Sequence, residues 1–278
     1  MQLETITQVA ESAFKEAGVK LKDIHLISVT SGPGLLGSLL TGISFAKSLN
    51  LVTGIPLLGV NHVHSHIYAN FLNGQGVKLP FLALVVSGGH TNLYFIKDFD
   101  KIELLGQTQD DACGEAFDKV AKILGLGYPG GPHIERFARS GNPKKFKFRC
   151  SGTKNPLNFS FSGIKTAVLY ATQKKHLTLT EKRDIAASFQ ECCIDTLIRK
   201  SFLACEIKGV NRLVVGGGVV ANSRLREKFF EEANHSNIQY YFPERRLCTD
   251  NAAMVAGFGY QLFKKGYKSD LYLNAEFS

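Results

Sequence analysis

The sequence has no apolar run long enough to cross a membrane. Its longest apolar runs, such as residues 81–86, are far shorter than the ~20 residues that a transmembrane helix needs. No positively charged segment followed by an apolar one opens the chain, so a secretory signal is not expected either. We therefore expect no membrane partner.

The sequence also lacks any C-x-x-C pair. Its cysteines are irregularly spaced and stand at positions 113, 150, 192, 193, 205 and 248. A chain of 278 residues can bury a core without disulfide bonds. We therefore predict reduced thiols of an intracellular protein, with Cys192 and Cys193 in the core. The expected location is the cytoplasm, with the mitochondrion as the alternative.

Basic residues outnumber acidic ones, and the formal net charge is +9. This balance suits a polyanion such as nucleic acid, although a solvated basic surface explains it as well. One stretch alternates basic with aromatic residues: Lys144, Lys145, Phe146, Lys147, Phe148 and Arg149. On a strand, this alternation would place the cations on one face, where they could contact a phosphate backbone. A solvated edge strand is the alternative.

Predicted strands and helices alternate along the chain. Apolar patterns and turn residues predict strands at residues 24–29, 56–60, 81–86, 91–96, 102–106, 212–215 and 238–242. They predict helices at residues 1–17, 37–51, 114–124, 131–138, 163–172, 181–205, 221–233 and 249–265. A strand, a glycine turn and a helix follow one another in both halves, which predicts two similar α/β lobes facing one cleft.

Two histidines stand four residues apart just after a predicted strand. On a helix, His62 and His66 project from one face and can share a metal ion, whereas His64 points elsewhere. Asp250 is a candidate third ligand, and two imidazoles with one carboxylate suit iron or zinc with positions open to substrate. A surface histidine cluster is the alternative. A metalloprotease is disfavoured because its H-E-x-x-H motif needs Glu after the first His, and Val63 stands there.

Polar glycine turns predict sites for anions or nucleotides. One turn joins two predicted strands and consists of Ser87, Gly88, Gly89 and His90. Its glycines let backbone N–H groups approach a phosphate, although a plain hairpin turn is the alternative. Three glycines at 216–218 precede a helix near Asn222. This asparagine could read a base or ribose edge, or it could simply cap the helix.

A charged helix follows the first glycine turn. Glu115, Asp118 and Lys119 fall on or near one face of it, where a carboxylate can hold ribose hydroxyls or a metal-bound phosphate. The alternative is an ordinary charged helix face. The rigid turn at 127–132 is of a kind that brings backbone against a ligand.

Together these segments resemble the family of tRNA N6-adenosine threonylcarbamoyltransferases. The motifs that carry the resemblance are residues 31–35, the pair His62 and His66, and residues 87–91, 110–119, 128–132, 159–166, 216–222 and 248–251. They occur in order over nearly the whole chain, so a chance match of single motifs does not explain them.

The resemblance implies a two-lobed actin/Hsp70-like ATPase fold of the α/β class. We expect residues 1–105 to form the remainder of the first lobe, with the histidine pair. Residues 106–278 would form the second lobe, with an irregular insertion at 140–162 and a C-terminal helix at 249–265 that returns toward the first lobe. Family members usually open with strands that precede the first long helix, so we expect the leading strands of the first lobe to be missing.

The resemblance also implies the site. It assigns His62, His66 and Asp250 as ligands of one divalent metal ion, with iron expected first and zinc second. It implies contacts to a bound nucleotide, threonylcarbamoyl-AMP or ATP, from Val86, Ser87, Gly88, Gly89, His90, Asp118, Gly131, Glu135 and Asn222. Family members often carry Asp in place of Glu135, so this exchange keeps the carboxylate but alters its reach.

The implied enzyme is an acyltransferase. It moves the threonylcarbamoyl group from threonylcarbamoyl-AMP to N6 of adenosine 37, next to the anticodon, in tRNAs that read ANN codons. Expected partners are tRNA with a paralogous actin-like subunit and a small ATPase, or a second copy if the protein is of the mitochondrial type. The alternatives are a metal-dependent carbamoyltransferase for a small-molecule acceptor and an ATP-binding, non-catalytic partner subunit. The metal ligands argue against the latter, and the basic stretch favours tRNA.

Overall fold

The chain folds into two compact α/β units, as the sequence predicts. The structure is a computed structural model that describes residues 2–173, 177–233 and 236–276. Unit 1 comprises Met1–Leu72 and Asn251–Ser278, and unit 2 comprises Asn73–Asp250. The division at Leu72 differs from the boundary expected after residue 105, because the strands between these positions pair with the sheet of unit 2. The C-terminal helix belongs to unit 1.

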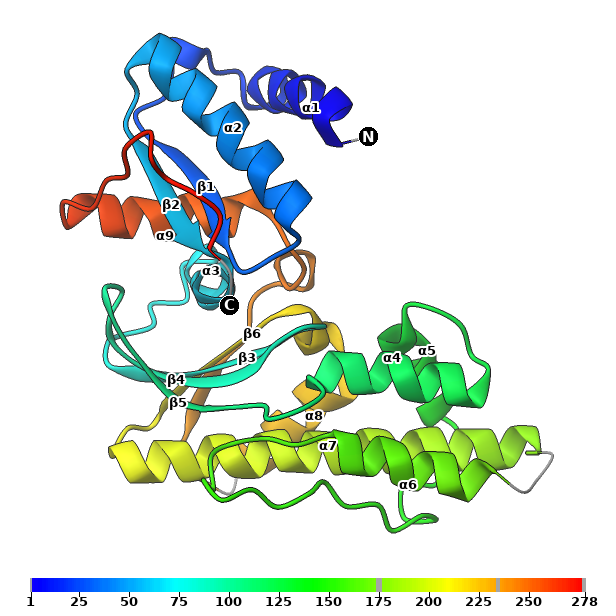
Figure 1. Ribbon diagram of the computed structural model, residues 1–278. Helices are drawn as coiled ribbons and strands as arrows, with labels where there is room; N and C mark the ends of the chain where they lie inside the picture. Colours follow the sequence, from blue (N-terminus) through cyan, green and yellow to red (C-terminus); the bar gives the residue numbers. More distant parts are fainter. Residues whose placement is uncertain (1, 174–176, 234–235, 277–278) are drawn as a thin grey trace. The chain divides into compact units, whose positions relative to one another are not determined.

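Unit 1 is built around two parallel strands. Its elements are α1 (Gln2–Ala17), β1 (Ile27–Gly32), α2 (Leu36–Thr53), β2 (Leu57–Asn61), α3 (His62–Tyr68) and α9 (Ala252–Lys264). Both α2 and α9 pack on β1 (Figure 1). A Cβ atom on Gly259 would lie 2.3 Å from the Ser28 hydroxyl, so the absence of a side chain lets α9 approach the strand closely.

The start of unit 1 departs from one expectation. Of the predicted helix 1–17, Met1 lies outside the described residues, and α1 occupies the rest of the range. The first strand begins at Ile27 rather than at residue 24, because Leu21–Asp23 forms a 3-10 turn. The Asp23 carboxylate accepts the N–H of Lys20 at 2.9 Å and closes this turn.

Unit 2 contains a five-stranded sheet with the order β5-β4-β3-β6-β7. Its strands are β3 (Phe81–Val86), β4 (Thr91–Asp98), β5 (Lys101–Gln107), β6 (Arg212–Gly216) and β7 (Gln239–Tyr241). Its helices are α4 (Cys113–Leu124), α5 (Gly130–Ala138), α6 (Ser162–Thr172), α7 (Leu179–Lys208), the 3-10 turn η3 (Gly218–Ala221) and α8 (Ser223–Ala233). The long helix α7 runs along one face of the sheet (Figure 1). Within the described residues, no helix combines the length and apolar content that a membrane crossing needs.

The predicted insertion at 140–162 is irregular, but its basic stretch forms no strand. The alternation of exposed basic and partly buried aromatic side chains is nevertheless present without strand pairing. Phe146 and Phe148 stack with ring centroids 5.7 Å apart and pack on the core, whereas Lys144, Lys145 and Lys147 are exposed. Burial of the two rings is therefore what directs the basic side chains to solvent.

Candidate active site

The two predicted metal-binding histidines lie on the short helix α3. Asn61 caps this helix by accepting the N–H of His64 at 3.0 Å, so the helix starts immediately after β2. One turn then separates His62 from His66, and their ring centroids lie 4.8 Å apart. His66 is 2% exposed. His64 faces Phe258 of α9 instead, and burial lowers its pKa to about 4.

The third predicted ligand joins this pair. Asp250 directly precedes Asn251, whose side chain caps α9 by accepting the N–H of Met254 at 2.9 Å. One potential ligand atom each from His62, His66 and Asp250 lie within 4.8 Å of one another. Two imidazoles and a carboxylate are a donor set that fits Fe²⁺ or Zn²⁺ with positions left for substrate. The residues present therefore fit the divalent metal that the resemblance implies.

A cavity of about 210 Å³ lies in unit 2 where the glycine turns meet. It is lined by Gly88, Gly114, Phe117, Asp118, Pro129, Gly131, Pro132, Glu135, Gly218, Val219, Ala221 and Asn222. Pockets for small molecules usually measure ~300–1,000 Å³, so a nucleotide would occupy it only in part. Of the predicted nucleotide contacts, the fold brings together here Gly88, Asp118, Gly131, Glu135 and Asn222. Gly114 and Gly218 lie within predicted motifs, but their role as lining residues was not predicted.

Two acidic side chains at this cavity, Asp118 and Glu135, each accept hydrogen bonds from the protein through only one of their two carboxylate oxygens. Asp118 accepts the N–H of Gly130 through Oδ1 at 2.6 Å and thereby positions the start of α5. Glu135 accepts through Oε1 from Arg139 and from the N–H of Ser223, both at 3.2 Å. The second oxygen of each carboxylate remains a hydrogen-bond acceptor that suits a ribose hydroxyl.

The turn after β3 contributes one residue, Gly88, to the lining of this cavity. Val86, Ser87, Gly89 and His90 do not line the cavity. Val86 is fully buried in β3, and Ser87 uses its hydroxyl to accept the N–H of His90 at 3.1 Å and its carbonyl to accept the N–H of Gly114 at 3.2 Å. These bonds close the turn against α4, so the backbone of Gly88 forms the cavity wall.

Asn222 acts as a helix cap. Its Oδ1 accepts the N–H of Leu225 at 3.0 Å, and its Nδ2 donates to Gln190 Oε1 at 2.8 Å. The sequence left nucleotide recognition and helix capping open as roles of Asn222, and this geometry favours capping. The residue still lines the cavity, so it shapes the wall.

The lining glycines and the adjacent Gly130, together called the cavity glycines, fall into two classes. A Cβ atom on Gly88, Gly131 or Gly218 would meet no heavy atom within 4 Å. On Gly114 it would lie 2.5 Å from the Ser87 carbonyl oxygen, and on Gly130 it would lie 2.5 Å from Asp118 Cα. The fold thus requires glycine at Gly114 and Gly130, whereas at the other three the fold leaves room for a side chain.

Two adjacent aspartates, whose structural role the sequence did not reveal, fix the segment before α4. Asp110 accepts the N–H groups of Phe161 and Ser162 at 2.8 and 3.2 Å, so its charge stands at the N-terminus of α6. Asp111 accepts Lys119 Nζ at 2.6 Å and Lys165 Nζ at 2.9 Å. The carboxylates thus join α4 and α6 beside the cavity.

Burial opposes ionisation of Asp111, but the hydrogen bonds from Lys119 and Lys165 outweigh it and lower the pKa of Asp111. The lowered pKa stabilises the fold at pH values above the unfolded pKa of ~3.9, and this contribution disappears as the pH falls through the folded value. Asp111→Asn should therefore cost about 1–3 kcal/mol near pH 7, roughly 2–10 °C in Tm, and much less at pH 3. Thermal unfolding at both pH values measures this.

Glu227→Gln is the control for that experiment. The Glu227 side chain is 62% exposed, so the Tm of this variant should barely differ from that of the parent protein. An Asp111→Asn variant as stable as the parent at pH 7, or more strongly affected at pH 3, would contradict the assignment.

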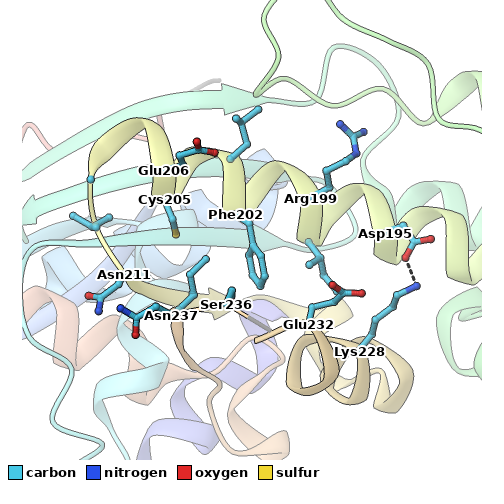
Figure 2. A pocket seen from close by; sticks show the side chains of 15 residues that line it. Asp195, Arg199, Phe202, Cys205, Glu206, Asn211, Lys228, Glu232, Ser236 and Asn237 are labelled. Atoms are coloured by element: carbon cyan, nitrogen blue, oxygen red, sulfur yellow. Dashed lines mark ion pairs between the residues drawn. The ribbon is translucent and has the colours of Figure 1, made fainter. Parts of the chain in front are cut away.

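A separate cavity of about 1,060 Å³ lies in unit 2 beside α7 and α8 (Figure 2). Phe202 and Cys205 point into it from α7, and the ion pair of Asp195 with Lys228 borders it. None of the glycine-turn residues lines it. Its size alone does not make it the stronger candidate for a nucleotide site, because the predicted contacts Gly88, Asp118 and Gly131 line the smaller cavity.

Sequence comparison relates this chain to one enzyme family. The family profile described as TsaD, tRNA N6-adenosine threonylcarbamoyltransferase, matches residues 2–257. A protein of that name from Thermosipho africanus is 50% identical over 98% of this chain and 83% of its own length. One from Clostridium kluyveri is 48% identical over 98% of this chain and 81% of its own length. These relatives do not favour the small-acceptor or non-catalytic alternatives.

The fold also occurs in solved structures. Full-length HypF in its phosphate- and nucleotide-bound form matches with a TM-score of 0.70 at 15% identity, over 94% of this chain and 41% of HypF. HypF of T. kodakarensis matches with a TM-score of 0.67 at 16% identity, over 90% of this chain and 42% of that one. At such identities the likeness concerns the fold alone. The sequence matches, which extend over nearly the whole chain, place this protein in the TsaD family of tRNA N6-adenosine threonylcarbamoyltransferases.

Proposed function

We propose that this chain transfers the threonylcarbamoyl group of threonylcarbamoyl-AMP to N6 of the adenosine next to the anticodon of tRNA. The adenosine nitrogen attacks the carbamoyl carbon, AMP leaves, and N6 gives up one proton. The observation that carries the proposal is the convergence of His62, His66 and Asp250 in a chain whose relatives bear this enzyme's name. A bound divalent ion would supply Lewis acidity and stabilise the developing oxyanion.

The residues of the unit 2 cavity have distinct roles in this proposal. Asp118 and Glu135 accept hydrogen bonds from the ribose hydroxyls of the adenylate. Gly88 and Gly131 leave room for the ligand, and Gly131 lies in the first turn of α5, whose N-terminus favours negative charge. The protein thus orients a substrate that already carries a good leaving group, so no covalent intermediate with the enzyme is needed.

Incubation of the purified chain with threonylcarbamoyl-AMP and unmodified tRNA tests the function. We expect the modified nucleoside in digests of the tRNA by mass spectrometry once the partner proteins are added. Modification of a small amine but never of tRNA would overturn the proposal. The proposed partners are a paralogous actin-like subunit and a small ATPase in the cytoplasm, and the resemblance of the sequence supports them.

We propose that the exposed cations of the basic stretch contact the tRNA backbone. Each phosphate contact contributes about 0.7–0.9 to the slope of log K against log salt. Replacing Lys144, Lys145 and Lys147 by alanine should therefore reduce the slope for tRNA binding by about 2 and weaken binding at low salt. Fluorescence anisotropy with labelled tRNA at several salt concentrations measures both.

The matched control removes the same charge from unit 1, where Lys15, Lys20 and Lys22 are also exposed. Their triple alanine variant should keep the slope of the parent protein. Equal slopes in the two triple variants would mean that only net charge matters and that the basic stretch is no tRNA contact.

A further inference from the structure

Two cysteines of unit 2 stand in contact outside the cavity and metal group described above. Cys150 lies in the irregular segment after α5, and Cys192 lies on α7. Their sulfur atoms are 3.9 Å apart. Both side chains are half-buried and both line a cavity of about 340 Å³, whereas Cys113, Cys193 and Cys248 are buried. The pair is therefore open to a small reagent.

We propose that Cys150 and Cys192 form a reversible disulfide bond when the protein meets a peroxide. A disulfide holds its sulfur atoms ~2.05 Å apart, so the two sulfurs must approach by about 1.9 Å. The segment that carries Cys150 lies outside helices and strands, so it can make this movement without breaking a ladder of backbone hydrogen bonds.

The surroundings of the pair favour the first chemical step. The cavity is also lined by Arg199, whose charge stabilises a thiolate at Cys150. The hydrogen bond from the Cys192 thiol is the main cause that lowers the pKa of Cys150, and the same contact raises the pKa of Cys192. Cys150 is thus the thiol that ionises first, and Cys192 keeps its proton.

The reaction balances with hydrogen peroxide as the oxidant. The Cys150 thiolate attacks one peroxide oxygen, which gives a sulfenic acid and hydroxide; this hydroxide takes up the proton released when the thiolate formed. The sulfur of Cys192 then attacks the sulfenic sulfur, the S–S bond forms, and the departing hydroxide takes the thiol proton. Two thiols thereby lose two electrons, and one peroxide becomes two waters. An external dithiol reverses the bond by exchange.

The bond would anchor the basic stretch. In the reduced protein, the segment is held by the packing of Phe146 and Phe148 and by the hydrogen bond from the N–H of Phe146 to Ser188 Oγ at 3.2 Å. A covalent link from Cys150 to α7 fixes the end of this stretch to the same helix. This inference does not depend on the proposed transferase activity.

Peptide mapping of the whole protein tests the inference. After treatment with hydrogen peroxide and alkylation of the remaining thiols, a tryptic digest should contain peptide 150–154 linked to peptide 184–199, in which Cys193 carries the alkyl group. Its mass should be two hydrogens below the sum of peptide 150–154 and the singly alkylated peptide 184–199. Four of the six cysteines should remain alkylatable, and dithiothreitol should restore all six. Cys150 oxidised to sulfinic acid with no linked peptide, or a link found only between two chains, would overturn the inference.

Neighbouring Cys193 provides the matched control. The linked peptide should vanish in Cys192→Ala and persist in Cys193→Ala. Fragmentation of the linked peptide from the unaltered protein identifies the partner independently, so the test holds even if a variant misfolds. A link from Cys150 to Cys193 in that spectrum would refute the proposed pair.

Discussion

Replacing both His62 and His66 by alanine is expected to abolish metal binding and tRNA modification together. Loss of residues that merely support a metal ligand already costs about 10–100-fold in affinity, so loss of two ligands should exceed 100-fold. Elemental analysis of the purified variant should find the metal near background, whereas the parent protein should carry about one ion per chain. This follows because only one carboxylate, Asp250, would remain of the three-residue group.

His64→Gln is the matched control on the same helix. His64 faces Phe258 and is not part of the metal group, so the variant should retain its metal while losing some packing. Circular dichroism distinguishes a folded, metal-free double variant from an unfolded one. Full activity in a folded double variant, or metal lost equally from His64→Gln, would remove the basis of the metal assignment.

Gly131→Val is expected to block the nucleotide cavity and leave the fold intact. A Cβ at Gly131 meets no atom within 4 Å, and the residue lines the cavity. The valine side chain would therefore occupy space that the adenylate needs. Overpacking costs about 1–3 kcal/mol, which weakens binding roughly tenfold to hundredfold. Calorimetric titration with AMP measures the affinity, and thermal unfolding without nucleotide measures the stability.

Substitution of the preceding residue, Gly130, should have the opposite effect and destabilise the fold. A Cβ at Gly130 would lie 2.5 Å from Asp118 Cα and 2.6 Å from the Phe117 carbonyl oxygen. Gly130→Ala should therefore lower Tm, because α5 must move away from α4. If Gly131→Val bound AMP like the parent protein, the cavity would not be the nucleotide site. If both variants lost stability equally, the division of the cavity glycines into two classes would be wrong.

Much of the unit 2 architecture was predictable because the determining residues are neighbours in sequence. The apolar runs on either side of Ser87-Gly88-Gly89-His90 predict the hairpin of β3 and β4, and both strands occur where expected. The strand predicted at 24–29 was displaced, since the Asp23 side chain bonds the Lys20 backbone and forms a turn there. The division between the units lies at Leu72 and not after residue 105, because pairing of β3 with β6 joins residues far apart in sequence.

The sequence by itself determined the α/β class, the spacing of His62 and His66 on one helix face, and the resemblance that identifies the family. These depend on periodicity, turn chemistry and residue type, which act over a few positions. Only the tertiary structure decided that Gly88, Asp118 and Gly131 share one cavity wall while His90 does not, and that Asn222 caps a helix. It also decided the contact of Cys150 with Cys192. Such proximity arises from packing among distant segments, and no local pattern encodes it.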